Sequence, residues 1–408
     1  MKEPPVNDVP EAPSSLSFEA RVLRPRRAAP ADIVRPTRAE VDLAALRTNL
    51  RVAQRAAAGA KVWGVVKADA YGHGAPAVAR TLERAGIDGF CVALVEEGLE
   101  LRRAGVSAPI LLMGGRYGGA HTEVLQANMV PVVYDLGEVE AFARVVRARD
   151  IDGPVHVHVK IDTGMARLGV LPRDATAFGE ALATFPEIRV SGLMTHLACA
   201  DSPDPESMRE QARMFEATCA DLARTGIAPS VRHAANSAAL LRGELRFDAV
   251  RPGIALFGTA PFAGAPGGEE LVPTLRVRTE VVDMRDVPVG GTVGYGALFR
   301  AQRASRIATV PLGYADGLPR SLTNRGFMLV RGKRAPIVGA VSMDMCMLDV
   351  TDHAGASVGD EVVALGSQDG PLGKDRVLAQ EIAEWADTIS WEVLTHISRR
   401  VPRFYREP

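Results

Sequence analysis

Apolar and polar residues follow two different patterns along this chain, and the pattern changes near Leu271. Before that point, short apolar runs alternate with segments in which apolar residues recur every three or four positions. Such runs are typical of strands buried on both faces, and the second spacing is typical of helices that bury one face. The runs lie at residues 62–66, 89–94, 109–113, 129–134, 155–161, 188–195, 230–234 and 247–251.

Residues 39–41 predict a short strand that leads into a helix capped by Asp42. Alternating strands and helices require parallel strands that are joined by right-handed crossovers. Eight such units over roughly two hundred residues match the size of a (β/α)8 barrel. An open doubly wound sheet is the alternative, but no Gly-x-Gly-x-x-Gly turn supports it. Further helices are predicted at residues 75–85, 96–104, 177–183 and 207–224.

After Leu271, period-two alternation and glycine-containing turns predict a mostly β domain that ends with one helix at 379–384 and an arginine-rich tail at 398–406. The fold class is therefore α/β: a TIM-like (β/α)8 barrel followed by a mostly β C-terminal domain. We expect a flexible extension at 1–36, the barrel at 37–270 and the β domain at 271–408. The strands of the last part are predicted at residues 275–287, 306–311, 326–330, 335–341, 345–350 and 361–365.

Composition excludes several classes of protein. The 408 residues are 47% apolar and 24% charged, with a net charge of −1, so neither a nucleic acid nor an anionic membrane is an expected partner. No apolar run approaches the length of a membrane span, and the extension lacks the apolar core of a secretory signal. The four cysteines show no paired spacing, which fits reduced thiols in the cytoplasm. His196 and Cys199 could form half a metal site, but no second pair accompanies them, so no metal is expected.

Lys67 directly follows the apolar run at 62–66 and precedes a loop bounded by Gly72 and Gly74. A barrel strand presents functional residues at its C-terminal end. A partly desolvated lysine there loses its proton readily and can form an imine with a carbonyl. The alternative interpretation is a solvated surface charge.

Two later loops offer groups that could bind a phosphate. Ser237 follows the seventh barrel run, and Arg251 and Gly253 follow the eighth, where barrels often bind phosphate. Taken alone, Asn236-Ser237 could be a simple helix cap and Arg251 a surface residue before a turn. Their position on adjacent loops favours a phosphate site.

The segment from Val65 to Gly74 closely resembles the pyridoxal-phosphate lysine motif of the alanine racemase family. The resemblance implies that Lys67 binds pyridoxal 5'-phosphate as a Schiff base and that Arg251 faces the pyridine nitrogen. An arginine there keeps this nitrogen unprotonated and suits simple proton exchange, because arginine stays cationic. His196, which alone would be interpreted as a core histidine, is implied to pack on the cofactor ring. The implied phosphate contacts come from Tyr71, Ser237, Gly253 and Ile254.

Residues 159–169 resemble the lysine–arginine loop of the same family. Arg167 is implied to contact the substrate carboxylate and the phenolic oxygen of the cofactor, and Lys160 to carry a carbamate that orients Arg167. Residues 313–317 and 341–345 also match family segments. They imply an entrance role for Tyr314 and a backbone contact from Met343 to the substrate carboxylate, with Asp344 in the same motif.

Tyr295 lies between two glycines in the β domain, where a tyrosine has little packing value, although a plain turn is the alternative. Residues 292–296 resemble the catalytic tyrosine loop of the family. Racemisation removes a proton from one face and returns it on the other, so two bases are needed, and the resemblance assigns them to Lys67 and Tyr295. It also implies a head-to-tail homodimer and a role in supplying D-alanine for peptidoglycan.

The resemblance covers about residues 36–406. One departure is Arg399, at a position before Arg-Val-Pro-Arg where many members have a tyrosine; it puts the width of the entrance and the substrate breadth in doubt. A racemase that also accepts serine or lysine is one alternative. A decarboxylase of basic amino acids is another, although the Gly-Asp-x-x-Cys-Glu segment of those enzymes is missing. A non-catalytic cofactor-binding protein of similar type would consist of the barrel alone.

Overall fold

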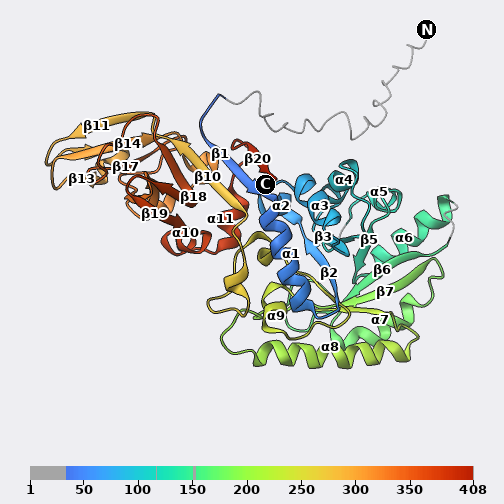
Figure 1. Cartoon of the computed structure of the whole chain (residues 1–408). Helices are drawn as coiled ribbons and strands as arrows, with labels where there is room; N and C mark the ends of the chain where they lie inside the picture. Colours follow the sequence, from blue (N-terminus) through green and yellow to red (C-terminus); the bar gives the residue numbers. More distant parts are fainter. Residues whose placement is uncertain (1–33, 116, 150–152, 408) are drawn as a thin grey trace, which may run out of the picture.

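The computed structural model describes residues 34–115, 117–149 and 153–407, which form two lobes (Figure 1). The larger lobe is a closed barrel of eight parallel strands, as the apolar runs predicted. Every residue of β3 and of β4 is buried, because parallel barrel strands are covered on both faces. The barrel strands are β2 (Lys61–Val65), β3 (Gly89–Val92), β4 (Ile110–Leu112), β5 (Val130–Val133), β6 (Val155–Lys160), β7 (Ile188–Met194), β8 (Val231–His233) and β9 (Ala249–Val250).

Helices surround the barrel strands (Figure 1). Asp42 caps the first of them, as predicted, and its carboxylate accepts a hydrogen bond of 2.9 Å from the Ala45 amide. Buried Asn49 on the same helix donates to the carbonyls of Leu256 and Val272, at 3.1 and 2.8 Å, and so fixes the chain where it leaves the barrel. The helices are α1 (Leu43–Ala57), α3 (Ala75–Arg84), α4 (Val95–Arg103), α5 (His121–Gln126), α6 (Leu136–Arg149), α7 (Ala175–Leu182), α8 (Glu206–Arg224) and α9 (Ser237–Arg242).

The smaller lobe is mostly β. Its main sheet has seven strands in the order β16-β15-β18-β10-β1-β20, with β19 paired to β18; a three-stranded sheet, β11-β14-β17, and the β12-β13 hairpin complete it. Its strands are β10 (Leu275–Glu280), β11 (Asp283–Val287), β12 (Thr292–Val293), β13 (Phe299–Arg300), β14 (Ser305–Val310), β15 (Phe327–Val330), β16 (Lys333–Pro336), β17 (Cys346–Asp349), β18 (Glu361–Gly370) and β19 (Gly373–Val377), joined by β1 (Arg38–Asp42) and β20 (Arg403–Arg406) from the chain ends, and its helices are α10 (Ala379–Ala386) and α11 (Ser390–His396).

Both ends of the described chain enter the main sheet. Strand β1 pairs antiparallel with β10 and parallel with β20, so blue and red segments lie side by side in Figure 1. Buried Glu40 on β1 stabilises this junction through ion pairs with Arg276 and Arg278, at 3.0 and 3.1 Å. From residue 38 the chain therefore first joins the sheet of the smaller lobe and then crosses into the barrel. The predicted extension lies outside the described residues up to residue 33, and the domain limits stay a prediction.

Two parts of the smaller lobe differ from the sequence prediction. The alternating stretch 275–287 is not one strand: it divides at Val281 into β10 and β11, which belong to different sheets. The helix predicted at 379–384 is followed by a second, α11, and the arginine-rich tail contains β20. None of the helices in the described ranges has the length and apolar character needed to cross a membrane.

Candidate active site

Lys67 lies where β2 ends at the mouth of the barrel and begins the short element α2 (Lys67–Tyr71). The four residues after it have positive φ values of 50 to 57°, so α2 is a left-handed turn made without glycine. Each such residue costs about 1–2 kcal/mol, so other contacts must stabilise the turn. Glu97 on α4 supplies one: its carboxylate accepts a hydrogen bond of 2.6 Å from the Ala68 amide.

Four basic residues lie at the barrel mouth and are close enough to affect one another electrostatically. They are Lys67, Lys160, Arg167 and Arg251. Lys67 keeps exposed surface, but the surrounding protein excludes enough water to lower its pKa, and Arg167 lowers it further. Burial, followed by repulsion from Arg167 and Arg251, lowers the pKa of Lys160 to about 8. Burial and the charge of Arg251 lower the pKa of His196 to about 3, so this ring is neutral. A dianionic ligand would be strongly favoured here.

Arg251 is buried at 2% exposure and donates three hydrogen bonds, to His233 Nδ1 at 2.5 Å and to the carbonyls of Thr195 and Ala234 at 2.8 and 3.1 Å. Because arginine only donates, His233 Nδ1 is the acceptor. The proton of His233 therefore sits on Nε2, 2.8 Å from His158 Nδ1. Burial lowers the pKa of Arg251 to about 10, which leaves it cationic at neutral pH.

Four other predicted residues form a compact group beside β9. The Ser237 hydroxyl accepts hydrogen bonds from the amides of Gly253 and Ala255, at 2.9 and 3.3 Å. A Cβ on Gly253 would lie 2.4 Å from the Tyr71 hydroxyl, so only glycine permits this approach. Burial raises the pKa of Tyr71, which keeps its hydroxyl protonated as a donor. Ile254 follows directly and is 1% exposed.

The loop that carries Arg167 is held by one carboxylate. Asp162 accepts four backbone hydrogen bonds of 2.8 to 3.1 Å, from the amides of residues 164–167. The hydroxyls of Thr163 and Thr195 lie 2.7 Å apart and join this loop to the end of β7, next to His196. The lysine–arginine loop is therefore rigidly connected to the neighbouring strand.

The remaining predicted residues lie on the smaller lobe and face solvent. Tyr295 is 77% exposed, Met343 53% and Tyr314 41%. The amide of Ala315 donates to the Met343 carbonyl at 3.0 Å, so the Tyr314 loop and the Met343 segment contact each other. Tyr295 lies in the turn between β12 and β13, and Figure 1 shows β13 at the end of the smaller lobe remote from α2. One chain thus brings the barrel residues together but leaves Tyr295 apart from Lys67.

The C-terminal tail contacts both the barrel residues near Lys67 and the smaller-lobe residues near Met343. Arg403 donates to the Gly72 carbonyl at 2.9 Å, beside the lysine turn. Arg400 donates to Asp344 at 2.7 Å, beside Met343. Arg399, the departure seen in the sequence, directly precedes Arg400 and is exposed.

Comparison with known proteins identifies the family. The sequence matches the family models "Alanine racemase, N-terminal domain" at residues 41–261 and "Alanine racemase, C-terminal domain" at 274–405. The chain belongs to the alanine racemase family. An alanine racemase from Sorangium cellulosum is 58% identical over 383 residues, 92% of this chain and 100% of the relative. One from Symbiobacterium thermophilum is 44% identical over 376 residues, with 92% and 98% covered.

Solved alanine racemase structures have the same architecture. The enzyme from the D-cycloserine producer Streptomyces lavendulae is 35% identical with a TM-score of 0.86, over 92% of this chain and 98% of that chain. The enzyme from Streptomyces coelicolor is also 35% identical, with a TM-score of 0.85 over 93% and 100%. The resemblance inferred from the motifs and the barrel-plus-β fold are therefore confirmed, and the chain is an isomerase of the alanine racemase family.

Several residues that organise this candidate site were not found from the sequence. Glu97 and Asp162 act by accepting backbone hydrogen bonds, and His158 acts through His233. The acidic start of α4 and the Asp-Thr-Gly motif were available signals for the two carboxylates. Nothing in the local sequence shows that His158 and His233 meet, because they lie on strands 75 residues apart.

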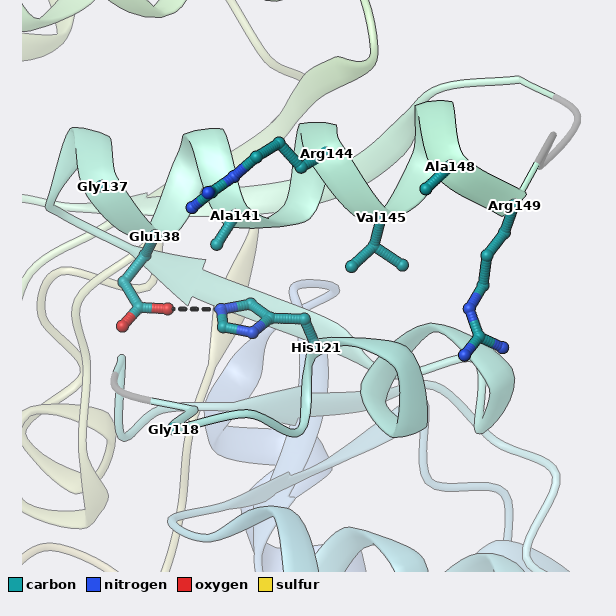
Figure 2. Close-up of a pocket in the computed structure, with 9 residues that line it drawn as sticks. All are labelled: Gly118, His121, Gly137, Glu138, Ala141, Arg144, Val145, Ala148 and Arg149. Atoms are coloured by element: carbon teal, nitrogen blue, oxygen red, sulfur yellow. Dashed lines mark hydrogen bonds and ion pairs between the residues drawn. The ribbon is translucent and has the colours of Figure 1, made fainter. Parts of the chain in front are cut away.

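A groove elsewhere on the barrel is separate from this racemase site. It lies between α5 and α6, where His121 Nε2 is 2.8 Å from Glu138 Oε2 and Arg144 and Arg149 lie along the rim (Figure 2). None of the candidate site residues lines it. Its His121–Glu138 pair joins two helices, so we interpret the groove as part of the outer helical layer.

Proposed function

We propose that the protein interconverts L-alanine and D-alanine, with pyridoxal 5'-phosphate bound at the barrel mouth and Lys67 and Tyr295 as the two bases. The observation that carries the proposal is the lysine of lowered pKa, surrounded by cations, at the end of a barrel strand. The amino-acid substrate class follows from the named activity of the relatives.

The residues present fit pyridoxal phosphate in three respects. Lys67 supplies an amine that loses its proton readily. Tyr71 and Ser237 supply hydroxyl groups next to Gly253, where the absence of a Cβ lets the Tyr71 hydroxyl approach the backbone. The cations at the mouth favour an anionic ligand of this kind. When bound, the cofactor supplies an electron sink that acidifies the α-proton of the amino acid.

Arg251 limits that electron sink. It is a cation fixed by three hydrogen bonds, so it can face the pyridine nitrogen but has no proton to give up at neutral pH. Its partner His233 is neutral, because burial and Arg251 keep the pKa of His233 well below its usual value. A weaker sink suits proton exchange and disfavours transamination.

Arg167 and the Met343 backbone are proposed to bind the substrate carboxylate, and Lys67 and Tyr295 to exchange protons on opposite faces of the α-carbon. His196 would pack on the cofactor ring, Tyr314 would line the entrance and Lys160 would carry a carbamate that orients Arg167. The high exposure of Tyr295 and Met343 supports a head-to-tail homodimer in which the smaller lobe completes the site of the partner. We further propose a cytoplasmic location and a role in supplying D-alanine for peptidoglycan.

The direct test is chiral analysis of the product after incubating the purified protein with L-alanine. D-alanine should appear and approach equal amounts of the two isomers. Separate incubations with L-serine and L-lysine test the broader specificity that Arg399 leaves open. Formation of an amine with loss of CO2 would instead identify a decarboxylase, and no change in any substrate would identify a binding protein.

The lysine assignment has its own test. The purified protein should absorb near the boundary of visible and ultraviolet light, and borohydride should fix the cofactor on the peptide that contains Lys67. Lys67→Ala should lose both the absorbance and the activity. Lys61, at the start of the strand β2 that precedes Lys67, is the control position, and a label on Lys61 or Lys160 would refute the assignment.

A further inference from the structure

A chain of ion pairs between arginines and aspartates connects Arg35, near the start of the described residues, to the Met343 segment of the smaller lobe. Arg35 donates from Nη1 and Nη2 to the two carboxylate oxygens of Asp316, at 3.1 and 2.7 Å. Arg400 Nε lies 3.7 Å from the same carboxylate, and Arg400 Nη2 donates to Asp344 at 2.7 Å. The order is Arg35, Asp316, Arg400, Asp344.

Asp316 depends on these arginines because it is fully buried, at 0% exposure. A buried carboxylate is costly unless it is paired and hydrogen-bonded. Arg35 makes the close two-point contact, which is the strongest geometry available to an arginine and a carboxylate. Arg400 is farther from Asp316 and makes its short contact to Asp344 instead.

Asp316 also fixes the loop that supports the Met343 segment. Its Oδ2 accepts a hydrogen bond of 3.0 Å from the Gly313 amide. The next two amides, of Tyr314 and Ala315, donate to the carbonyls of Ser342 and Met343, each at 3.0 Å. A Cβ on Gly313 would lie 2.3 Å from the Met343 carbonyl oxygen, so loop and segment are in direct contact. A shift of Asp316 must therefore move Met343.

Without Arg35, Arg400 would be the nearest cation to Asp316. A movement of Arg400 toward Asp316, now 3.7 Å from its Nε, would disturb the hydrogen bond of 2.7 Å from its Nη2 to Asp344. Asp344 directly follows Met343. Loss of Arg35 would therefore weaken two supports of the Met343 segment: the loop that Asp316 fixes and the hydrogen bond from Arg400 to Asp344.

We propose that Arg35 is a positioning residue for the substrate side of the site: its ion pair with Asp316 fixes the loop from Gly313 to Ala315 and leaves Arg400 to hold Asp344. The inference rests on the proposed function to the extent that Tyr314 and Met343 belong to the site.

The kinetic test uses Arg35→Ala in the full chain. The KM for alanine should rise more than kcat falls, because a substrate-binding segment is loosened rather than a base removed. Since coupling through positioning residues is worth about 0.5–2 kcal/mol, kcat/KM should fall roughly two- to thirty-fold. Arg35→Lys should recover part of the loss, because it restores the charge but not the two-point contact.

Arg38→Ala is the matched control. Arg38 lies in the same segment and pairs with Glu40 at 3.1 Å, on the sheet rather than at Asp316. Its KM should equal that of the wild type. An equal loss in Arg35→Ala and Arg38→Ala, or a normal KM in Arg35→Ala, would overturn the proposal.

Hydrogen–deuterium exchange separates this inference from the proposed function, because it needs no activity. Residues 342–345 close on themselves through a hydrogen bond of 2.9 Å from the Ser342 amide to the Met345 carbonyl. Exchange in this segment should speed up in Arg35→Ala and stay unchanged in Arg38→Ala. Unchanged exchange in Arg35→Ala would refute the role of Arg35 even in an active racemase. A wild-type protein that fails to racemise any substrate would refute only the proposed function.

Discussion

At the barrel mouth, most of the candidate residues are buried, with Lys67 and Arg167 as exposed exceptions, whereas on the smaller lobe the candidate residues are exposed. Arg251 is 2% exposed and donates to three acceptors, while Tyr295 is 77% exposed. The barrel side is rich in positive charge, and burial lowers the pKa values of Lys67, Lys160 and Arg251. The smaller lobe presents neutral side chains to solvent, among them Leu298 and Met343.

The difference indicates that contacts within one chain hold the barrel residues in place, whereas the exposed residues of the smaller lobe depend on contacts outside it. The barrel side can be assembled within one chain, because its loops are fixed by internal contacts such as those of Asp162 and Glu97. The smaller lobe exposes apolar residues beside Tyr295 and Met343, which is typical of an interface and is the reason for proposing a homodimer. A second copy of the chain would cover these residues and bring Tyr295 over Lys67.

The largest effect is expected on the exposed side, from Tyr295→Phe. The variant keeps the ring but loses the proton carrier, so racemisation should fall by about 10²–10⁴ while cofactor absorbance persists. In deuterated solvent, exchange of the α-proton should collapse for L-alanine and continue for D-alanine through Lys67. Equal residual exchange of both isomers would mean that a single base serves both faces.

A smaller effect is expected on the buried side, from Gly253→Ala. The new Cβ would lie 2.4 Å from the Tyr71 hydroxyl and displace it. Overpacking costs about 1–3 kcal/mol, so affinity for pyridoxal phosphate should weaken by roughly 5- to 150-fold in a titration. Gly119→Ala is the control, because nothing lies within 4 Å of its added Cβ. Unchanged affinity in Gly253→Ala would remove Gly253 from the phosphate site.

The smallest expected effect is a pH dependence at Lys160. Its pKa is lowered to about 8, so the fraction of neutral amine, the form that reacts with CO2, rises as the pH passes through 8. With labelled bicarbonate, a carbamate signal in carbon NMR should grow between pH 7 and 9 and be absent in Lys160→Arg. A signal that persists in Lys160→Arg would place the carbamate on another amine.

The same contrast explains what the sequence predicted well. Barrel strands appear as apolar runs because they are buried on both faces, and loop motifs such as the one around Arg167 keep their residues close in sequence. The division of 275–287 into β10 and β11 was missed because the alternation continues while the chain changes sheets at Val281. The left-handed turn after Lys67 was missed because its four residues with positive φ include no glycine, which is the usual sequence signal for that conformation. Arg35 and Asp316 are 281 positions apart, and no local pattern links them.

The most direct test of a site shared between two chains mixes two inactive variants, Lys67→Ala and Tyr295→Phe. After subunit exchange, a mixed dimer would have one site with Lys67 from one chain and Tyr295 from the other, and one site with neither. With random exchange, half of the dimers are mixed and half of their sites are intact, so activity should recover to about a quarter of the wild-type value. No recovery, despite verified exchange, would contradict the account and mean that Tyr295 acts within its own chain or is not catalytic.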